Sequence, residues 1–137
     1  MKHWIVLALL VSATAISQVV APVDSTLERL AKVDRFAFGP TGYAGVTSQG
    51  EKDYKVVLSR PSAETDFEKL FAMGNPQAKA YALVGIRALT PARWKELSRT
   101  LRDSKEEVVT QNGCIVDHEP LGTVLKRIEA GDYSRRK

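Results

Sequence analysis

Cysteine and histidine are almost missing from this chain of 137 residues, which contains one cysteine, Cys114, and two histidines, His3 and His118. A single cysteine excludes an internal disulfide, so packing has to stabilise the fold. So few cysteines and histidines leave little from which to build a metal site or a thiol-histidine pair. We therefore expect no metal ion and no cofactor.

Low-complexity segments are missing too, and charged residues make up an ordinary 26% of the sequence, which favours an ordered globular domain. The net charge is +4, and part of this excess comes from basic residues near the C-terminus: Lys126, Arg127, Arg135, Arg136 and Lys137. We interpret this cluster as a solvated basic tail, with binding to an anionic surface as the alternative. No nucleic-acid partner is expected.

The N-terminal segment is typical of a signal peptide. Residues 1–3 carry one fixed positive charge, and residues 4–11 (WIVLALLV) form an unbroken apolar run. Small residues at 13, 15 and 17 fit cleavage after about residues 15–17, with residue 21 as an alternative site. We therefore expect residues 1–17 to be a signal peptide and residues 18–137 to form one periplasmic or secreted domain. An uncleaved membrane anchor is the alternative, because apolar residues continue to Ala21 and reach the ~17 residues needed to span a bilayer.

Apolar periodicity and helix-capping residues predict six short helices in the rest of the chain. They are expected at residues 24–34, 48–59, 62–73, 76–89, 91–103 and 120–130. The expected caps and stops are Asp24 or Ser25, a Ser48–Glu51 capping box, Ser62, Asn75 and Thr90 at helix starts, and left-handed Gly74 and Gly131 at helix ends. The helix at 76–89 is apolar around most of its circumference and should be buried on most sides, whereas the helix at 91–103 should pack by one face.

Two β-prone runs, residues 108–111 and 114–117, flank Asn112-Gly113 and predict a β-hairpin with a type I′ turn and Gln111 opposite Cys114. Residues 39–45 contain three glycines and a proline and are expected to be a connecting loop. The predicted fold is thus mainly α, a compact bundle of about six short helices with one hairpin near 107–118.

Cys114 and His118 are the candidate residues for chemistry, because they lie four positions apart with Asp117 and Glu119 beside the histidine. On a strand this spacing separates their Cα atoms by roughly 13 Å, so direct contact is not expected. We therefore interpret Cys114 as a half-buried structural cysteine, with a reactive thiol or an intermolecular disulfide as the alternative.

Residues 75–83 (NPQAKAYAL) follow the glycine stop at Gly74 with a short turn and an alanine-rich helix. In this respect the segment of about residues 62–101 resembles one helical pair of a HEAT-like repeat. HEAT-like repeats are a binding architecture, so the resemblance implies interaction rather than catalysis. The chain as a whole also resembles small exported bacterial proteins of unassigned function.

These observations favour a non-enzymatic binding protein of the bacterial envelope over an enzyme. We expect a protein partner to meet either the hairpin, at Asn112 and Gly113, or the loop that contains Gly42 and Tyr43. The alternative is a thiol-dependent activity or a redox-sensitive dimerisation through Cys114, assisted by His118.

Overall fold

The computed structural model describes residues 24–134. The predicted signal peptide at residues 1–17 and the basic residues 135–137 lie outside the described residues. Within residues 24–134, no helix is both long enough and apolar enough to cross a membrane.

Six helices and four strands follow one another along the described chain. Their order is α1 (Ser25–Ala31), β1 (Phe36–Thr41), β2 (Val46–Thr47), α2 (Gln49–Leu58), α3 (Ala63–Met73), α4 (Pro76–Leu89), α5 (Pro91–Leu101), β3 (Glu107–Gly113), β4 (Ile115–Pro120) and α6 (Leu121–Ala130). Helices account for 57% of the described residues and strands for 19%. The prediction of a mainly α bundle with one hairpin is therefore wrong, because the chain forms an α/β fold with a mixed sheet.

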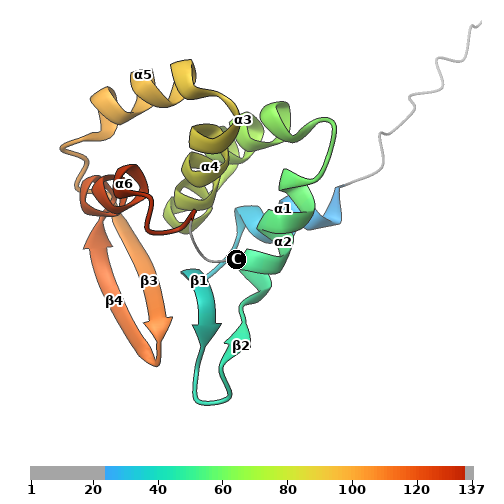
Figure 1. Cartoon of the computed structure of the whole chain (residues 1–137), viewed down its shortest axis with the longest axis vertical. Coiled ribbons are helices and arrows are strands. Elements are labelled where there is room, and N and C mark those ends of the chain that lie inside the picture. The colour runs from blue at the N-terminus through green and yellow to red at the C-terminus, as the bar shows by residue number, and fades with distance from the viewer. Residues whose placement is uncertain (1–23, 135–137) are drawn as a thin grey trace, which may run out of the picture.

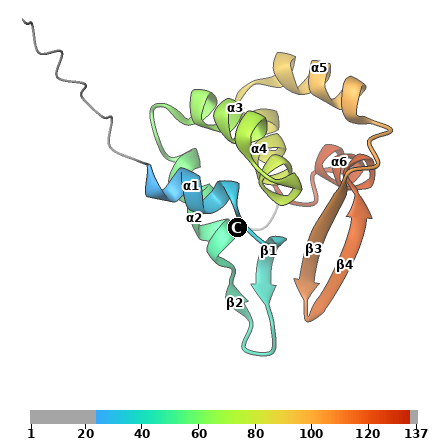
Figure 2. The same cartoon turned by 180° about the vertical axis from the view of Figure 1, so that it is seen from behind.

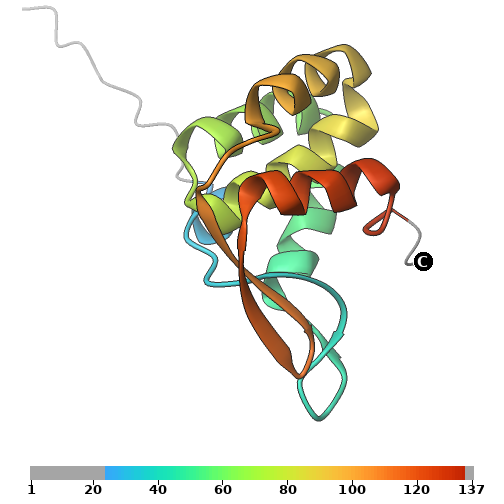
Figure 3. The same ribbon diagram turned by 90° about the vertical axis from the view of Figure 1, so that its left-hand side faces the viewer.

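The four strands lie in the order β2-β1-β3-β4. β1 pairs antiparallel with β2, β3 pairs antiparallel with β4, and the two central strands β1 and β3 are parallel. Both hairpin turns lie at the end of the molecule opposite α5 (Figures 1 and 2). Figure 3 shows α6 lying above the start of the β3–β4 hairpin, on the helical side of the molecule.

β1 was not predicted: the second half of this strand falls in the predicted loop at 39–45, and no element was predicted for Phe36 to Phe38. Its β-prone part is only three residues long, Phe36 to Phe38, and a glycine and a proline follow directly. The strand forms because both aromatic side chains are buried in the core and because β3, about 70 residues later, pairs with it. Local composition carries no signal for such a distant partner.

α4 is the central helix, as its nearly continuous apolar surface predicted. Its buried residues are Ala78, Ala80, Tyr81, Ala82, Leu83, Val84, Gly85 and Ile86. Gly85 lets α3 pack closely, since a Cβ atom at this position would lie 2.4 Å from the ring of Phe67. At the sheet side, the Tyr81 hydroxyl accepts a hydrogen bond from the Ala37 amide at 3.0 Å and donates one to the Ala37 carbonyl at 2.7 Å. The helix therefore fixes the position of β1.

The six helices were predicted because their starts carry local signals. The side chains of Asp24, Ser48 and Asn75 accept hydrogen bonds from the amides of Leu27, Glu51 and Ala78, respectively. Gly131 ends α6 in the left-handed conformation with φ of 83°. These residues act as predicted, because each makes its bond within the segment that carries the signal.

Other predicted helix ends differ in the structure. Glu51 does not complete the capping box, because its Oε2 accepts a hydrogen bond from the Gly39 amide on β1 at 2.7 Å. Gly74 has φ of −79° rather than a positive value, and a Cβ atom there would lie 2.5 Å from that of Ala78. Ser62 and Thr90 make no capping bond with their side chains. A tertiary contact thus decides the role of Glu51, whereas the Ser62 hydroxyl donates to Asp66 within its own helix.

Candidate functional site

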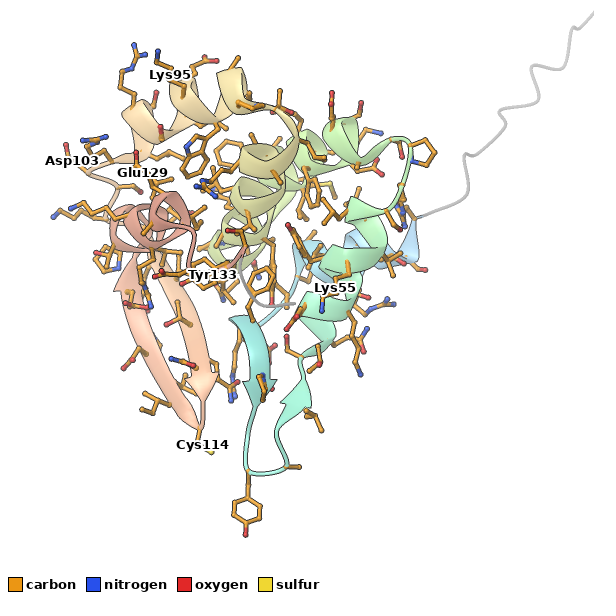
Figure 4. All side chains as sticks on the ribbon, in the orientation of Figure 1. Lys55, Lys95, Asp103, Cys114, Glu129 and Tyr133 are labelled. Atoms are coloured by element: carbon orange, nitrogen blue, oxygen red, sulfur yellow. The ribbon has the colours of Figure 1, made fainter. Side chains whose placement is uncertain are left out.

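Cys114 is exposed in the turn between β3 and β4, at the tip of the hairpin (Figure 4). The interpretation as a half-buried structural cysteine is therefore wrong. His118 lies on β4, where its Nδ1 atom is 2.7 Å from Oε1 of Glu107 on the neighbouring strand. Three strand residues separate Cys114 from His118, and the histidine pairs with a carboxylate instead of the thiol. The structure does not bring these two candidates together.

The turn of the hairpin lies one residue further along the chain than predicted. Asn112 pairs with Ile115, so Gly113 and Cys114 form the two-residue loop, and Gln111 lies opposite Val116. Gly113 has φ of 60° and no non-glycine residue of the described chain has a positive φ, which fits a type II′ turn rather than type I′. Each β3 residue thus pairs with a β4 residue two positions later than predicted. A shift of two positions leaves every paired side chain on its predicted face.

The two loops predicted to bind a partner lie side by side. The Gly42 amide donates a hydrogen bond to the Gly113 carbonyl at 3.0 Å, and Thr41 pairs with Gly113 at the end of the parallel ladder. Tyr43 is fully exposed next to this contact. The candidate residues Gly42, Tyr43, Asn112 and Gly113 therefore belong to one end of the molecule rather than to two alternative sites.

Exposed apolar side chains gather at this end. Six large apolar side chains of the described chain are exposed, and four of them lie on the two hairpins: Tyr43, Val46, Ile115 and Val116. Ile115 is 65% exposed and Val46 is 58% exposed. We call Tyr43, Val46, Cys114, Ile115 and Val116 the hairpin-tip surface. Ile115 and Val116 lie on opposite faces of the β3–β4 hairpin, so these residues surround the hairpin end rather than form one continuous patch.

A pocket of about 420 Å³ opens beside the hairpin, on the face of β3 and β4 that is directed toward α6. Its aromatic part consists of Phe36, Phe38 and Tyr133, whose rings contact one another edge-on or tilted at centroid distances of 4.8–5.5 Å. Tyr133 comes from the segment after α6 and lies between α6 and β1 (Figure 4). The pocket thus combines an aromatic wall with the polar face of an edge hairpin.

Four charged side chains line the same pocket: Asp117, Glu119, Arg127 and Asp132. Glu119 is neutralised, because its Oε2 accepts hydrogen bonds from Arg127 and from the Thr110 hydroxyl, the latter at 2.7 Å. Within residues 24–134, no group donates a hydrogen bond to the side-chain carboxylate of Asp117 or Asp132. Asp117 and Asp132 are both exposed, so among residues 24–134 the pocket entrance carries two carboxylates without a protein partner, while the buried Nε atom of Arg127 has no hydrogen-bond partner either.

Two tyrosines in the core between the helices and β1, Tyr54 and Tyr81, have raised pKa values. Burial raises the pKa of Tyr54 to about 12, and burial also raises the pKa of Tyr81. Elsewhere, the hydrogen bond from Arg60 lowers the pKa of Asp24 at the start of α1. These groups stabilise the fold, since Tyr81 fixes β1 and Asp24 caps a helix.

The pocket was not predicted from the sequence. Asp117 ends the predicted strand at 114–117, Glu119 lies beyond it, and no element was predicted for residues 132–133. Among residues 24–134, no group of three or more histidine, cysteine, aspartate or glutamate side chains is placed to hold a metal ion.

No family model, no curated protein and no solved structure matches this chain. The HEAT-like resemblance of residues 62–101, which form α3, α4 and α5, therefore stays a prediction.

Proposed function

We propose that this protein is a small exported, non-enzymatic binding protein of the bacterial envelope that holds a protein partner at its hairpin end. The observation that carries the proposal is the gathering of exposed apolar side chains on two adjoining hairpins, the hairpin-tip surface. Export rests on the charge and apolar pattern of residues 1–17.

The strand edges add to this argument. β4 is six residues long, pairs with β3 on one side only, and is at the edge of the sheet. Its main-chain groups on the other side are free to pair with an incoming strand, which is a common mode of peptide recognition. Cys114 and His118 lie apart and the histidine pairs with Glu107, so the arrangement favours binding over thiol catalysis.

Site-specific photo-crosslinking in the producing cell tests the proposal. A photoreactive amino acid at Tyr43 or at Ile115 should give the same discrete adduct, because both positions belong to the hairpin-tip surface. Val56 and Met73 are matched controls, since they are exposed apolar residues on helices away from that surface, and they should give none. Equal adducts from all four positions, or none from any, would contradict the proposal.

A redox-sensitive dimerisation through Cys114 is the second candidate, and the exposure of the thiol at the hairpin tip favours it. Oxidation of the protein should then give a dimer on non-reducing gels that Cys114→Ser abolishes. A protein that stays monomeric under oxidising conditions at high concentration would dismiss this function.

A further inference from the structure

We infer that the pocket beside β4 receives a lysine or arginine side chain of an extended partner segment that pairs with the free edge of β4. This inference rests on the proposed binding function and specifies the chemistry of the partner. It joins two observations that are independent of each other, the unpaired edge strand and the pocket that opens on one face of the same hairpin.

The edge of β4 is open to an incoming strand. Proteins protect sheet edges with charged side chains, lysine above all, or with prolines, bulges or very short strands. β4 contains no lysine, its ladder with β3 is regular over six consecutive pairs, and its single proline is its last residue, Pro120. Its charged residues on the pocket face, Asp117 and Glu119, are acidic and oppose an acidic strand rather than a basic one. The opposite edge strand, β2, has only two residues. The sheet therefore offers one edge that is long enough for strand addition.

The alternation of side chains along β4 determines which face of an added strand would be next to the pocket. Ile115, Asp117 and Glu119 line the pocket, whereas Val116 and His118 are on the other face. A residue opposite Asp117 in an added strand has its Cβ atom about 5 Å away and on the same face. A long side chain at that position is thus on the pocket face, near the exposed carboxylates of Asp117 and Asp132, which have no partner among residues 24–134.

The remaining pocket groups favour a long basic side chain. Glu119 is already paired with Arg127 and Thr110, so the net charge available to a ligand comes from Asp117 and Asp132. Tyr133 is the accessible member of the aromatic wall, since Phe36 and Phe38 are buried, and its ring offers apolar contact for the methylene groups of such a side chain.

A second copy of this chain fits the edge poorly. The two-fold antiparallel pairing that uses all of Ile115 to Glu119 places Asp117 opposite the Asp117 of the other copy and Ile115 opposite Glu119. Like charges that lie directly opposite each other destabilise a strand pair. The charge of β4 thus disfavours self-association and favours a basic strand.

Two capped seven-residue peptides of alternating threonine and valine test the inference. One peptide has lysine at its centre, and the matched peptide has norleucine there. Amide NMR spectra of the exported, processed protein should show shifts at residues 115–119 and at Tyr133 with the lysine peptide. Its affinity should exceed that of the norleucine peptide about fivefold, and high salt should reduce the difference.

Three variants locate the effect. Asp117→Asn and Asp132→Asn should each remove most of the preference for lysine and leave norleucine binding unchanged. Glu107→Gln is the matched control, because it removes the same charge on the opposite face of the hairpin, and it should retain the preference. A fourth preparation lacks residues 135–137, because Arg135, Arg136 and Lys137 follow the pocket residues in sequence and could compete as cations.

Equal affinity of both peptides at β4 would overturn the basic specificity and leave the hairpin-end binding function standing. Lysine binding that is seen only after removal of residues 135–137 would also overturn it, because the chain's own cations would then occupy the pocket. The absence of any shift at β4 in every preparation would overturn strand addition. The crosslinking experiment at Tyr43 and Ile115 decides the proposed function separately.

Discussion

Removal of the Tyr81 hydroxyl should destabilise the protein by about 2 kcal/mol. In Tyr81→Phe the Ala37 amide, which is buried, loses the hydroxyl that accepts its hydrogen bond at 3.0 Å. An unsatisfied buried donor costs about 1–3 kcal/mol. The Ala37 carbonyl loses less, because it also accepts a hydrogen bond from the Ser48 hydroxyl at 3.2 Å. We therefore place the loss near the middle of this range.

Tyr54→Phe is the matched control. It removes the same hydroxyl from another buried aromatic residue of the core, but within residues 24–134 no group hydrogen-bonds to the Tyr54 hydroxyl. Its free energy of unfolding should change by less than about 0.5 kcal/mol. Urea titration at pH 7 measures both variants, and the midpoint of Tyr81→Phe should fall by about 1 M. Equal midpoints for the two variants would refute the argument that Tyr81 fixes β1.

Four further results are expected. Burial raises the pKa of Tyr54 to about 12, so its contribution to stability is complete below pH 10 and is lost as the pH rises toward 12. In an absorbance titration at alkaline pH, Tyr54→Phe should therefore lose the late ionisation of this tyrosine. An unchanged titration curve would contradict this expectation. Asp24→Asn should lower the free energy of unfolding by about 1 kcal/mol at pH 7, because the pairing with Arg60 weakens. This loss should shrink below pH 3.8, since a carboxylate whose folded-state pKa is lowered stabilises the fold only above its pKa in the unfolded chain. A loss that does not change with pH would disagree with this expectation. Cys114 should react with an alkylating reagent in the folded protein at the rate of an exposed thiol, and protection until unfolding would be inconsistent with its position. Mass spectrometry of the cell-derived protein should show a new N-terminus after about residues 15–17, whereas an intact Met1 would exclude cleavage.

The helices could be predicted because apolar periodicity marks each of them and side-chain caps begin α1, α2 and α4 within their own segments. Asn75 caps α4 through the amide of Ala78 three residues later, and the apolar circumference of this helix correctly indicated burial. The same local rules predicted the β3–β4 hairpin and the faces of its side chains, although not the identity of its turn residues.

β1 and the pocket could not be predicted in this way. Phe36 and Phe38 form a strand through their pairing with β3 and through the contact of Ala37 with Tyr81, and both partners are more than 40 residues away. Tyr133 belongs to the site because its ring contacts that same strand. The predicted loop at 39–45 therefore hid the second half of β1, and nothing in the sequence predicted that Phe36, Phe38 and Tyr133 would come together.

The parallel pairing of β1 with β3 has a consequence for the order of folding. β1 is synthesised near the start of the described chain, but its partner follows only after α2, α3, α4 and α5. Pairing between distant segments forms late, since the loop between them has to close first. The two hairpin turns therefore meet only when nearly all of the chain is available. An incomplete chain lacks the assembled hairpin end, so a partner that recognised this end would distinguish finished molecules from unfinished ones.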